Sequence, residues 1–100
     1  MLYKIEKTDA FSLQLKNILF YLSFNFSLKI AHEYRIYIEE QLKNLAEFPY
    51  LGKRKTLLDD NQCLYLISKK NIILYSVDEE RKVVHLLYIA SANENYLNLL

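Results

Sequence analysis

The sequence predicts an α+β fold in which a helical hairpin packs on a mostly antiparallel sheet. The first half of the chain carries two stretches with apolar residues at helical spacing. The second half carries three runs rich in β-branched and aromatic residues, joined by short polar connectors. A short strand-like segment precedes the helices. We therefore expect the order strand, helix, helix and three strands, followed by a short C-terminal helix.

Length and composition limit the classes of protein that fit. The chain has 100 residues, so we expect residues 1–100 to form one domain. Apolar residues make up 52% and charged residues 25%, which argues against disorder. The formal net charge of +1 gives no global argument for nucleic-acid binding.

Few residues in the chain are suited to metal or cofactor binding. The single cysteine, Cys63, excludes an internal disulfide and a cysteine-rich zinc site, and we expect it to be a small buried hydrophobe. A single glycine rules out a glycine-rich phosphate loop. His85 has no second ligand at metal-binding spacing, and His32 is expected to be exposed. The acidic runs 59–61 and 78–80 are turn formers. We expect neither a metal nor a cofactor.

The sequence also predicts the compartment. A free thiol is typical of a reducing environment. No apolar run reaches the roughly 18 residues that a membrane span needs. Charges at Lys4, Glu6 and Lys7 do not fit a signal peptide. We expect a cytoplasmic protein without a membrane partner.

The first half of the chain is predicted in some detail. In "LYKIE", Tyr3 and Ile5 share one side of a short strand. Thr8 or Asp9 can cap a first helix, and Ser27 can cap a second. The apolar positions of the first helix are Phe11, Leu15, Ile18, Leu19, Leu22 and Phe26. The second helix has a cleaner stripe, formed by Ala31, Tyr34, Ile38, Leu42 and Leu45, opposite a polar face of Lys29, Glu33, Glu40 and Lys43.

The stretch "FPYLGKRK" holds the only proline and the only glycine. Pro49 should end the second helix, because proline disfavours helical geometry at the residue before it. We expect Gly52 to supply a positive φ for the following turn. Tyr50 is expected to be exposed beside a run of three cations, Lys53, Arg54 and Lys55.

The second half predicts a three-stranded antiparallel meander over residues 63–68, 72–77 and 83–90. Both faces of these strands are apolar in sequence. One face should pack on the helices, and the other should meet something else. The "KKN" turn and the end of the last strand should share one end of the sheet, whereas Arg81 and Lys82 lie in the other hairpin.

These residues resemble the RelE/ParE superfamily of toxins from bacterial type II toxin–antitoxin systems, over essentially the whole chain. The order of elements matches that family. "LAEFPYLGK" is similar to its "L…FPxxG" segment, "IILYSVDEERKVVHLLYI" to its "YxIxYxVd…vvV" region, and "ENYLNLL" to the "R[DN]YxxLL" ending of ParE-like members.

The resemblance implies a toxin of the plasmid-stabilisation or addiction type, neutralised by a cognate antitoxin. RelE-like members cut messenger RNA in the ribosome, whereas ParE-like members inhibit DNA gyrase; one fold serves both activities. We favour the ParE-like activity, without bond cleavage by the toxin itself. A RelE-like ribosome-dependent mRNA endonuclease is the alternative, and a non-toxic antitoxin-binding relic is a third.

The resemblance also implies candidate residues. In a ribonuclease, Lys53, Lys55 or Lys69 would stabilise phosphorane charge, and Tyr96 would transfer a proton. The arginine of the family ending is replaced by Glu94. This reversal of charge favours the hypothesis that the protein inhibits gyrase. The candidate target-binding residues are Tyr50, Lys53, Arg54, Lys55, Lys69 and Lys70. An antitoxin segment or a second copy in a homodimer would cover the apolar surface that the helices leave open.

Overall fold

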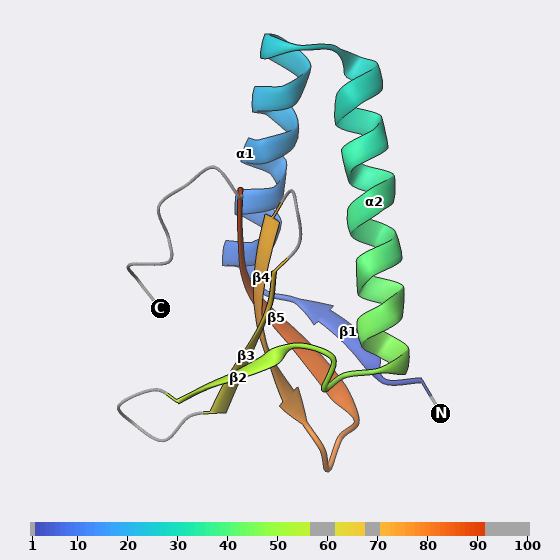
Figure 1. Ribbon diagram of the computed structural model, residues 1–100, viewed down its shortest axis with the longest axis vertical. Helices are drawn as coiled ribbons and strands as arrows, with labels where there is room; N and C mark the ends of the chain where they lie inside the picture. Colours follow the sequence, from blue (N-terminus) through green and yellow to red (C-terminus); the bar gives the residue numbers. More distant parts are fainter. Residues whose placement is uncertain (1, 57–61, 68–70, 92–100) are drawn as a thin grey trace.

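The computed structural model describes residues 2–56, 62–67 and 71–91 (Figure 1). The elements, in chain order, are β1 (Lys4–Lys7), α1 (Asp9–Asn25), α2 (Leu28–Glu47), β2 (Lys53–Thr56), β3 (Gln62–Ile67), β4 (Asn71–Asp78) and β5 (Val83–Ser91). The predicted α+β hairpin-on-sheet architecture is confirmed, with one strand more than expected. The C-terminal helix that we expected falls outside the described residues.

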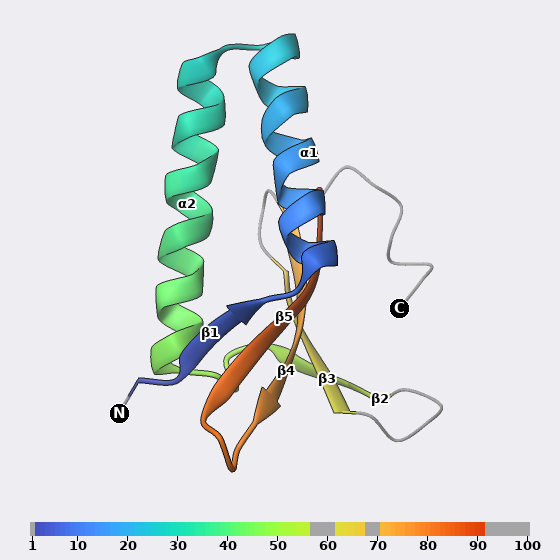
Figure 2. The ribbon, with the colours of Figure 1, turned by 180° about the vertical axis from the view of Figure 1, so that it is seen from behind.

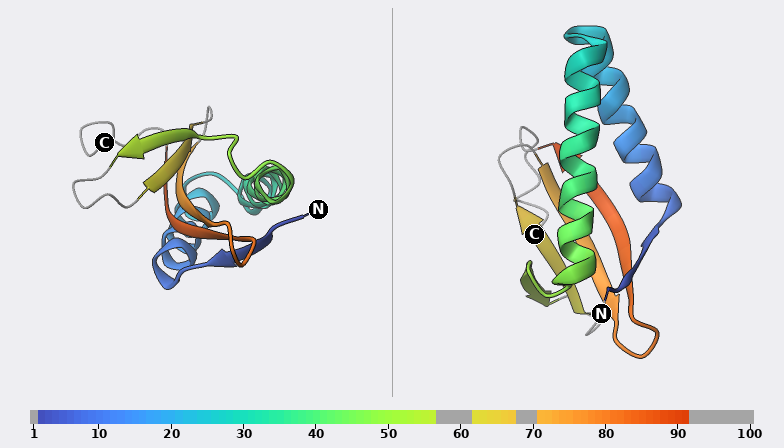
Figure 3. Two further views of the ribbon diagram at one scale, coloured as in Figure 1. Left: turned by 90° about the horizontal axis from the view of Figure 1, so that it is seen from below. Right: turned by 90° about the vertical axis from the view of Figure 1, so that its right-hand side faces the viewer.

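The five strands form one mixed sheet in the order β1-β5-β4-β3-β2. Only β1 and β5 pair in parallel; the other three pairings are antiparallel. Both helices lie on the same side of this sheet (Figure 3). The unexpected strand is β2, which pairs with β3 from Lys53↔Tyr65 to Thr56↔Gln62. Its Lys-Arg-Lys sequence lacks apolar alternation, a composition that suits an exposed sheet edge, where charge discourages further pairing.

Thr8 fixes the junction between β1 and α1. Its hydroxyl accepts a hydrogen bond from the Phe11 amide at 3.1 Å and so caps the helix. The same hydroxyl donates to the Leu87 carbonyl on β5 at 3.2 Å. Of the two predicted caps, Thr8 is therefore the one used. The predicted apolar stripe is right through Leu22 but wrong at Phe26, which follows the helix end and is 61% exposed.

The second helix forms as predicted. Ser27 caps it by accepting from the Ile30 amide, and the helix ends two residues before Pro49. The buried residues of the helix are Ala31, Tyr34, Ile38, Leu42 and Leu45, the five predicted ones. These positions share one face because three- and four-residue steps return to the same side of a 3.6-residue turn.

The core lies between the helices and one face of the sheet. Its fully buried members include Phe11 and Ile38 from the helices and Ile73 and Tyr75 from β4. Burial of an aliphatic or aromatic side chain of this size stabilises a fold by roughly 1.5–3 kcal/mol. On the opposite face, Ile67 and Tyr88 remain 49% and 38% exposed. The prediction of apolar residues on both faces is therefore confirmed for the described strands.

Gly52 differs from the prediction. Its φ is not positive, so the turn does not need its conformational freedom. A Cβ at this position would instead lie 2.6 Å from the Tyr65 carbonyl oxygen and 2.7 Å from the Tyr75 hydroxyl. Gly52 is required because the chain passes close to the sheet on its way into β2.

The connection between α1 and α2 lies at one end of the longest axis of the molecule, and the β4–β5 turn lies near the other (Figures 1 and 2). The upper turns of both helices extend past the strands. Within the described residues, no helix has the length and apolar character needed to cross a membrane.

Candidate functional site

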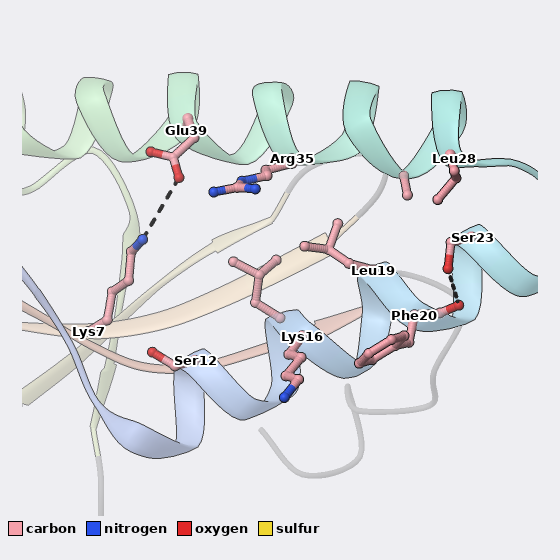
Figure 4. Close-up of a pocket in the computed structure, with 11 residues that line it drawn as sticks. Lys7, Ser12, Lys16, Leu19, Phe20, Ser23, Leu28, Arg35 and Glu39 are labelled. Atoms are coloured by element: carbon pink, nitrogen blue, oxygen red, sulfur yellow. Dashed lines mark hydrogen bonds and ion pairs between the residues drawn. The ribbon is translucent and has the colours of Figure 1, made fainter.

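A groove lies between α1 and α2 (Figure 4). Its volume is about 450 Å³. Apolar side chains from both helices line it, with polar and charged groups among them. The lining residues are Lys7, Ser12, Leu15, Lys16, Leu19, Phe20, Ser23, Leu28, Ala31, Arg35 and Glu39. Such a groove between two helices is suited to an amphipathic segment of a partner.

The charges of the groove are mostly positive. Lys7 and Glu39 form an ion pair at 3.8 Å near one end. Lys16 and Arg35 also line the groove, and within the described part of the chain neither forms an ion pair. Lys16 lies 5.8 Å from the centre of the Phe20 ring, a cation–π contact. The groove therefore offers an apolar lining with two cations available to an acidic partner.

A second cluster, which we call the Glu79 clasp, joins three distant segments near the β4–β5 turn. It consists of Tyr3, Tyr50, Glu79 and Lys82. The Glu79 carboxylate accepts hydrogen bonds from the Tyr3 hydroxyl at 2.6 Å, from the Tyr50 hydroxyl and from the Lys82 ammonium. Lys82 also lies 5.3 Å from the centre of the Tyr3 ring. The clasp thus links the start of the chain, the α2–β2 connection and the β4–β5 turn.

The clasp shifts the pKa values of its members. The Lys82 ammonium, followed by the two tyrosine hydroxyls, lowers the pKa of Glu79 to about 2. The hydrogen bond to Glu79 raises the pKa of Tyr50 to about 12, because an ionised tyrosine would lose that bond and face a carboxylate. Tyr50 is therefore a hydrogen-bond donor at neutral pH and not a base.

The cations predicted as candidates fall into two groups. Lys53, Arg54 and Lys55 lie in the edge strand β2, and Lys53 is exposed. The three cations therefore belong to a strand that the sequence analysis did not predict. Tyr50 is exposed, as predicted, and it is bonded to Glu79. The other candidates, Lys69, Lys70 and Tyr96, lie outside the described residues, as does Glu94.

Other predicted roles can be compared with the structure. Cys63 is buried, as predicted. The side chain of His85 is 29% exposed, and its Nδ1 lies 3.4 Å from a carboxylate oxygen of Glu6, a partner that only the parallel pairing of β1 with β5 supplies. His32 is exposed, as predicted. The described residues contain no group of three side chains that could hold a metal ion.

The sequence reasoning missed both the groove and the clasp. Lys16 and Arg35 belong to different helices, and only the hairpin brings them to one groove. Tyr3 and Glu79 are separated by 76 positions. One signal for the groove was available, because no acidic residue occurs between Asp9 and Glu33.

The chain is similar to a known protein family and to a solved structure. The family model for the "ParE toxin of type II toxin-antitoxin system, parDE" matches residues 5–96. No curated protein matches the chain. One similar solved structure is the toxin–antitoxin complex RelBE2 from Mycobacterium tuberculosis, with a TM-score of 0.68 at 16% sequence identity, covering 91% of this chain and 99% of that one. At that identity the likeness supports the fold alone. The chain belongs to the ParE toxin family of type II toxin–antitoxin systems.

Proposed function

We propose that this toxin acts in the bacterial cytoplasm by docking on DNA gyrase, without breaking bonds with its own side chains. The observation that carries the proposal is the match to the ParE family over residues 5–96, because ParE-like members are the gyrase inhibitors of the superfamily that the sequence resembles. The exposed edge strand β2, with Lys53 at its start, is the docking surface that we favour.

One described target-binding candidate, Tyr50, is unsuited to a part in catalysis. Cleavage of RNA by the neighbouring 2′-hydroxyl needs a base, a stabilising cation and an acid within reach of one phosphate. Tyr50 is engaged with Glu79, and its raised pKa keeps it protonated. The ribonuclease candidates that the resemblance implies, Lys53, Lys55, Lys69 and Tyr96, keep the mRNA endonuclease as the rival proposal.

Two assays with the purified toxin separate these activities. We expect inhibition of gyrase supercoiling and accumulation of cleaved DNA, with no codon-positioned cuts in messenger RNA added with ribosomes. The Tyr96→Phe variant should retain its effect on gyrase. Ribosome-dependent cuts that Lys69→Ala or Tyr96→Phe abolishes would instead establish the endonuclease. The absence of both effects, together with no growth arrest in cells, would identify a non-toxic relic.

We further propose that the groove between α1 and α2 receives a segment of the cognate antitoxin. The argument rests on shape and charge: an apolar lining, with Lys16 and Arg35 both free of ion pairs in the described part of the chain, fits an amphipathic helix with an acidic side. Co-purification of the toxin with the product of a small neighbouring acidic reading frame tests the pairing. Loss of that complex on Arg35→Glu locates it at the groove.

A further inference from the structure

The end of the helical hairpin exposes an unusual amount of apolar surface. We call this end the hairpin tip, and its members are Phe20, Tyr21, Phe24, Phe26, Leu28 and Ile30. Phe24 is 83% exposed and Leu28 is 80% exposed. The rings form two contacts along the tip, Phe20 with Phe24 at 6.3 Å and Tyr21 with Phe26 at 6.4 Å between centroids. Aromatic side chains with such high solvent exposure are typical of an interaction surface.

The tip is convex. It consists of the last two turns of α1, the connection and the first turn of α2, and it projects beyond the strands along the longest axis of the molecule (Figures 1 and 2). Its apolar side chains come from both helices and from the connection. The apolar surface of the tip is therefore built by both helices and their connection. A deformable medium can adapt to such an irregular surface.

Several polar groups of the tip form hydrogen bonds within the hairpin. The Ser23 hydroxyl donates to the Phe20 carbonyl at 2.9 Å, and the Asn25 amide donates to the Tyr21 carbonyl at 2.9 Å. Ser27 accepts from the Ile30 amide at 3.1 Å. The backbone amides of residues 26 and 27 both donate to the Leu22 carbonyl. These bonds lower the cost of moving the tip out of water.

The charges around the tip are mostly positive, and the exception is Glu33, an exposed carboxylate three residues past Ile30 on α2. Between Asp9 and Glu33 the chain contains no acidic residue, and it contains two lysines, Lys16 and Lys29. Lys29 is exposed in the first turn of α2, and Lys16 lies one turn behind the tip on α1. An apolar end followed by cations is complementary to a surface that is apolar inside and anionic outside.

We propose that the hairpin tip inserts shallowly into the interface of an anionic lipid bilayer and holds the toxin at the membrane surface. A second copy of the chain fits less well, because two such tips would bring Lys16 and Lys29 of both copies together, against a single nearby carboxylate, Glu33, in each. The sequence led us to expect no membrane partner because no segment could span a bilayer. A peripheral contact needs no such segment, since aromatic and aliphatic side chains at the interface suffice when cations meet anionic lipid.

Vesicle sedimentation tests the proposal with the full chain. We expect binding to vesicles of phosphatidylglycerol and phosphatidylethanolamine, and little binding to phosphatidylcholine alone. The double variant Phe24→Ser/Leu28→Ser should bind about tenfold more weakly or worse, since two exposed apolar side chains leave the interface. Leu13→Ser is the matched control, because Leu13 is also an exposed apolar residue of α1, at 57%, but lies away from the tip. Equal loss in the control and in the tip variant would overturn the proposal.

A fluorescence measurement locates the contact. The chain has no tryptophan, so Phe24→Trp gives a single reporter at the tip and Phe48→Trp a single reporter at the far end of α2. Anionic vesicles should shift the emission of the first to the blue, and lipids with shallow quenchers should quench it. The second should not respond. Identical responses, or none from Phe24→Trp, would refute insertion of the tip.

Two further experiments test the role of the lysines near the tip and the nature of the partner. The variant Lys16→Gln/Lys29→Gln should lose the preference for anionic lipid, whereas Lys43→Gln should keep it. If the tip variants weaken only the binding of a protein partner, with vesicle binding unchanged, the tip is a protein interface and the proposal is wrong. The gyrase assay uses no lipid, so its outcome is independent of this proposal.

Discussion

The backbone amide of Gly52 donates a hydrogen bond to the hydroxyl of Tyr75, 23 positions later, at a distance of 2.9 Å. Tyr75 is fully buried in β4, and Gly52 lies where the chain leaves α2 for the edge strand β2. This bond satisfies the hydroxyl of Tyr75, which is buried away from water. It also fixes how closely the α2–β2 connection approaches the sheet.

Replacing Gly52 by alanine should destabilise the fold. The new methyl would lie within 3 Å of the Tyr65 carbonyl oxygen and of the Tyr75 hydroxyl, and the first is backbone that cannot easily move. We expect a loss of about 1–3 kcal/mol in the free energy of unfolding, measured by urea denaturation. Leu51→Ala, at an exposed neighbouring position, is the control and should change little. An unchanged stability in Gly52→Ala would contradict the close approach of the α2–β2 connection to the sheet.

Two buried tyrosines should respond differently to the loss of the hydroxyl. Tyr75→Phe leaves the Gly52 amide unpaired and should cost about 1–3 kcal/mol. The Tyr34 hydroxyl is buried with no hydrogen-bond partner among the described residues, and its burial raises its pKa. Tyr34→Phe should therefore leave stability unchanged or raise it by up to about 1 kcal/mol. A clear loss of stability in Tyr34→Phe would reveal a partner for that hydroxyl.

The Glu79 clasp should make the free energy of unfolding depend on pH in the acidic range. The pKa of Glu79 falls from 4.5 to about 2 in the folded protein, so folding favours the charged carboxylate. The contribution is complete above about pH 4.5 and is lost as the pH falls through about 2. In Glu79→Gln, denaturation midpoints should fall below those of the wild type at pH 7, and this difference should narrow towards pH 2.

Glu80→Gln is the control for the clasp, since Glu80 lies in the same turn and is exposed. It removes one carboxylate and should leave the pH dependence of the wild type intact. The clasp also has an alkaline limit. Because the pKa of Tyr50 is raised from 10 to about 12, its bond to Glu79 should contribute fully below pH 10 and fail as the pH rises through about 12. Tyr50→Phe should show a smaller alkaline loss, because Tyr3 keeps its own bond to Glu79, which also raises the pKa of Tyr3.

Charge reversal in the groove should weaken the antitoxin. In Lys16→Glu/Arg35→Glu, two cations that line the groove become anions and repel an acidic helix. We expect at least about tenfold weaker binding in titration calorimetry, with a smaller dependence on salt. Lys43→Glu changes the same charge on the solvated face of α2 and should bind normally. Equal affinities for all three proteins would place the antitoxin elsewhere.

Local features of the sequence were predictable because they depend on near neighbours. The five buried positions of α2, the Ser27 cap and the stop before Pro49 follow from helical period and backbone chemistry. The burial of Cys63 follows from its place in an apolar strand. The resemblance of three short motifs, in order, added the family, which the match over residues 5–96 confirmed.

The sequence by itself therefore determined the helices, the core strands and the family. Tertiary structure alone decided that Lys53–Thr56 forms an edge strand, since pairing with Gln62–Ile67 supplies the hydrogen bonds that this charged segment does not predict. The tertiary structure also leaves no room for a side chain at residue 52. It brings Tyr3, Tyr50 and Lys82 together at Glu79. These features depend on contacts between residues far apart in the chain, and no local pattern encodes such contacts.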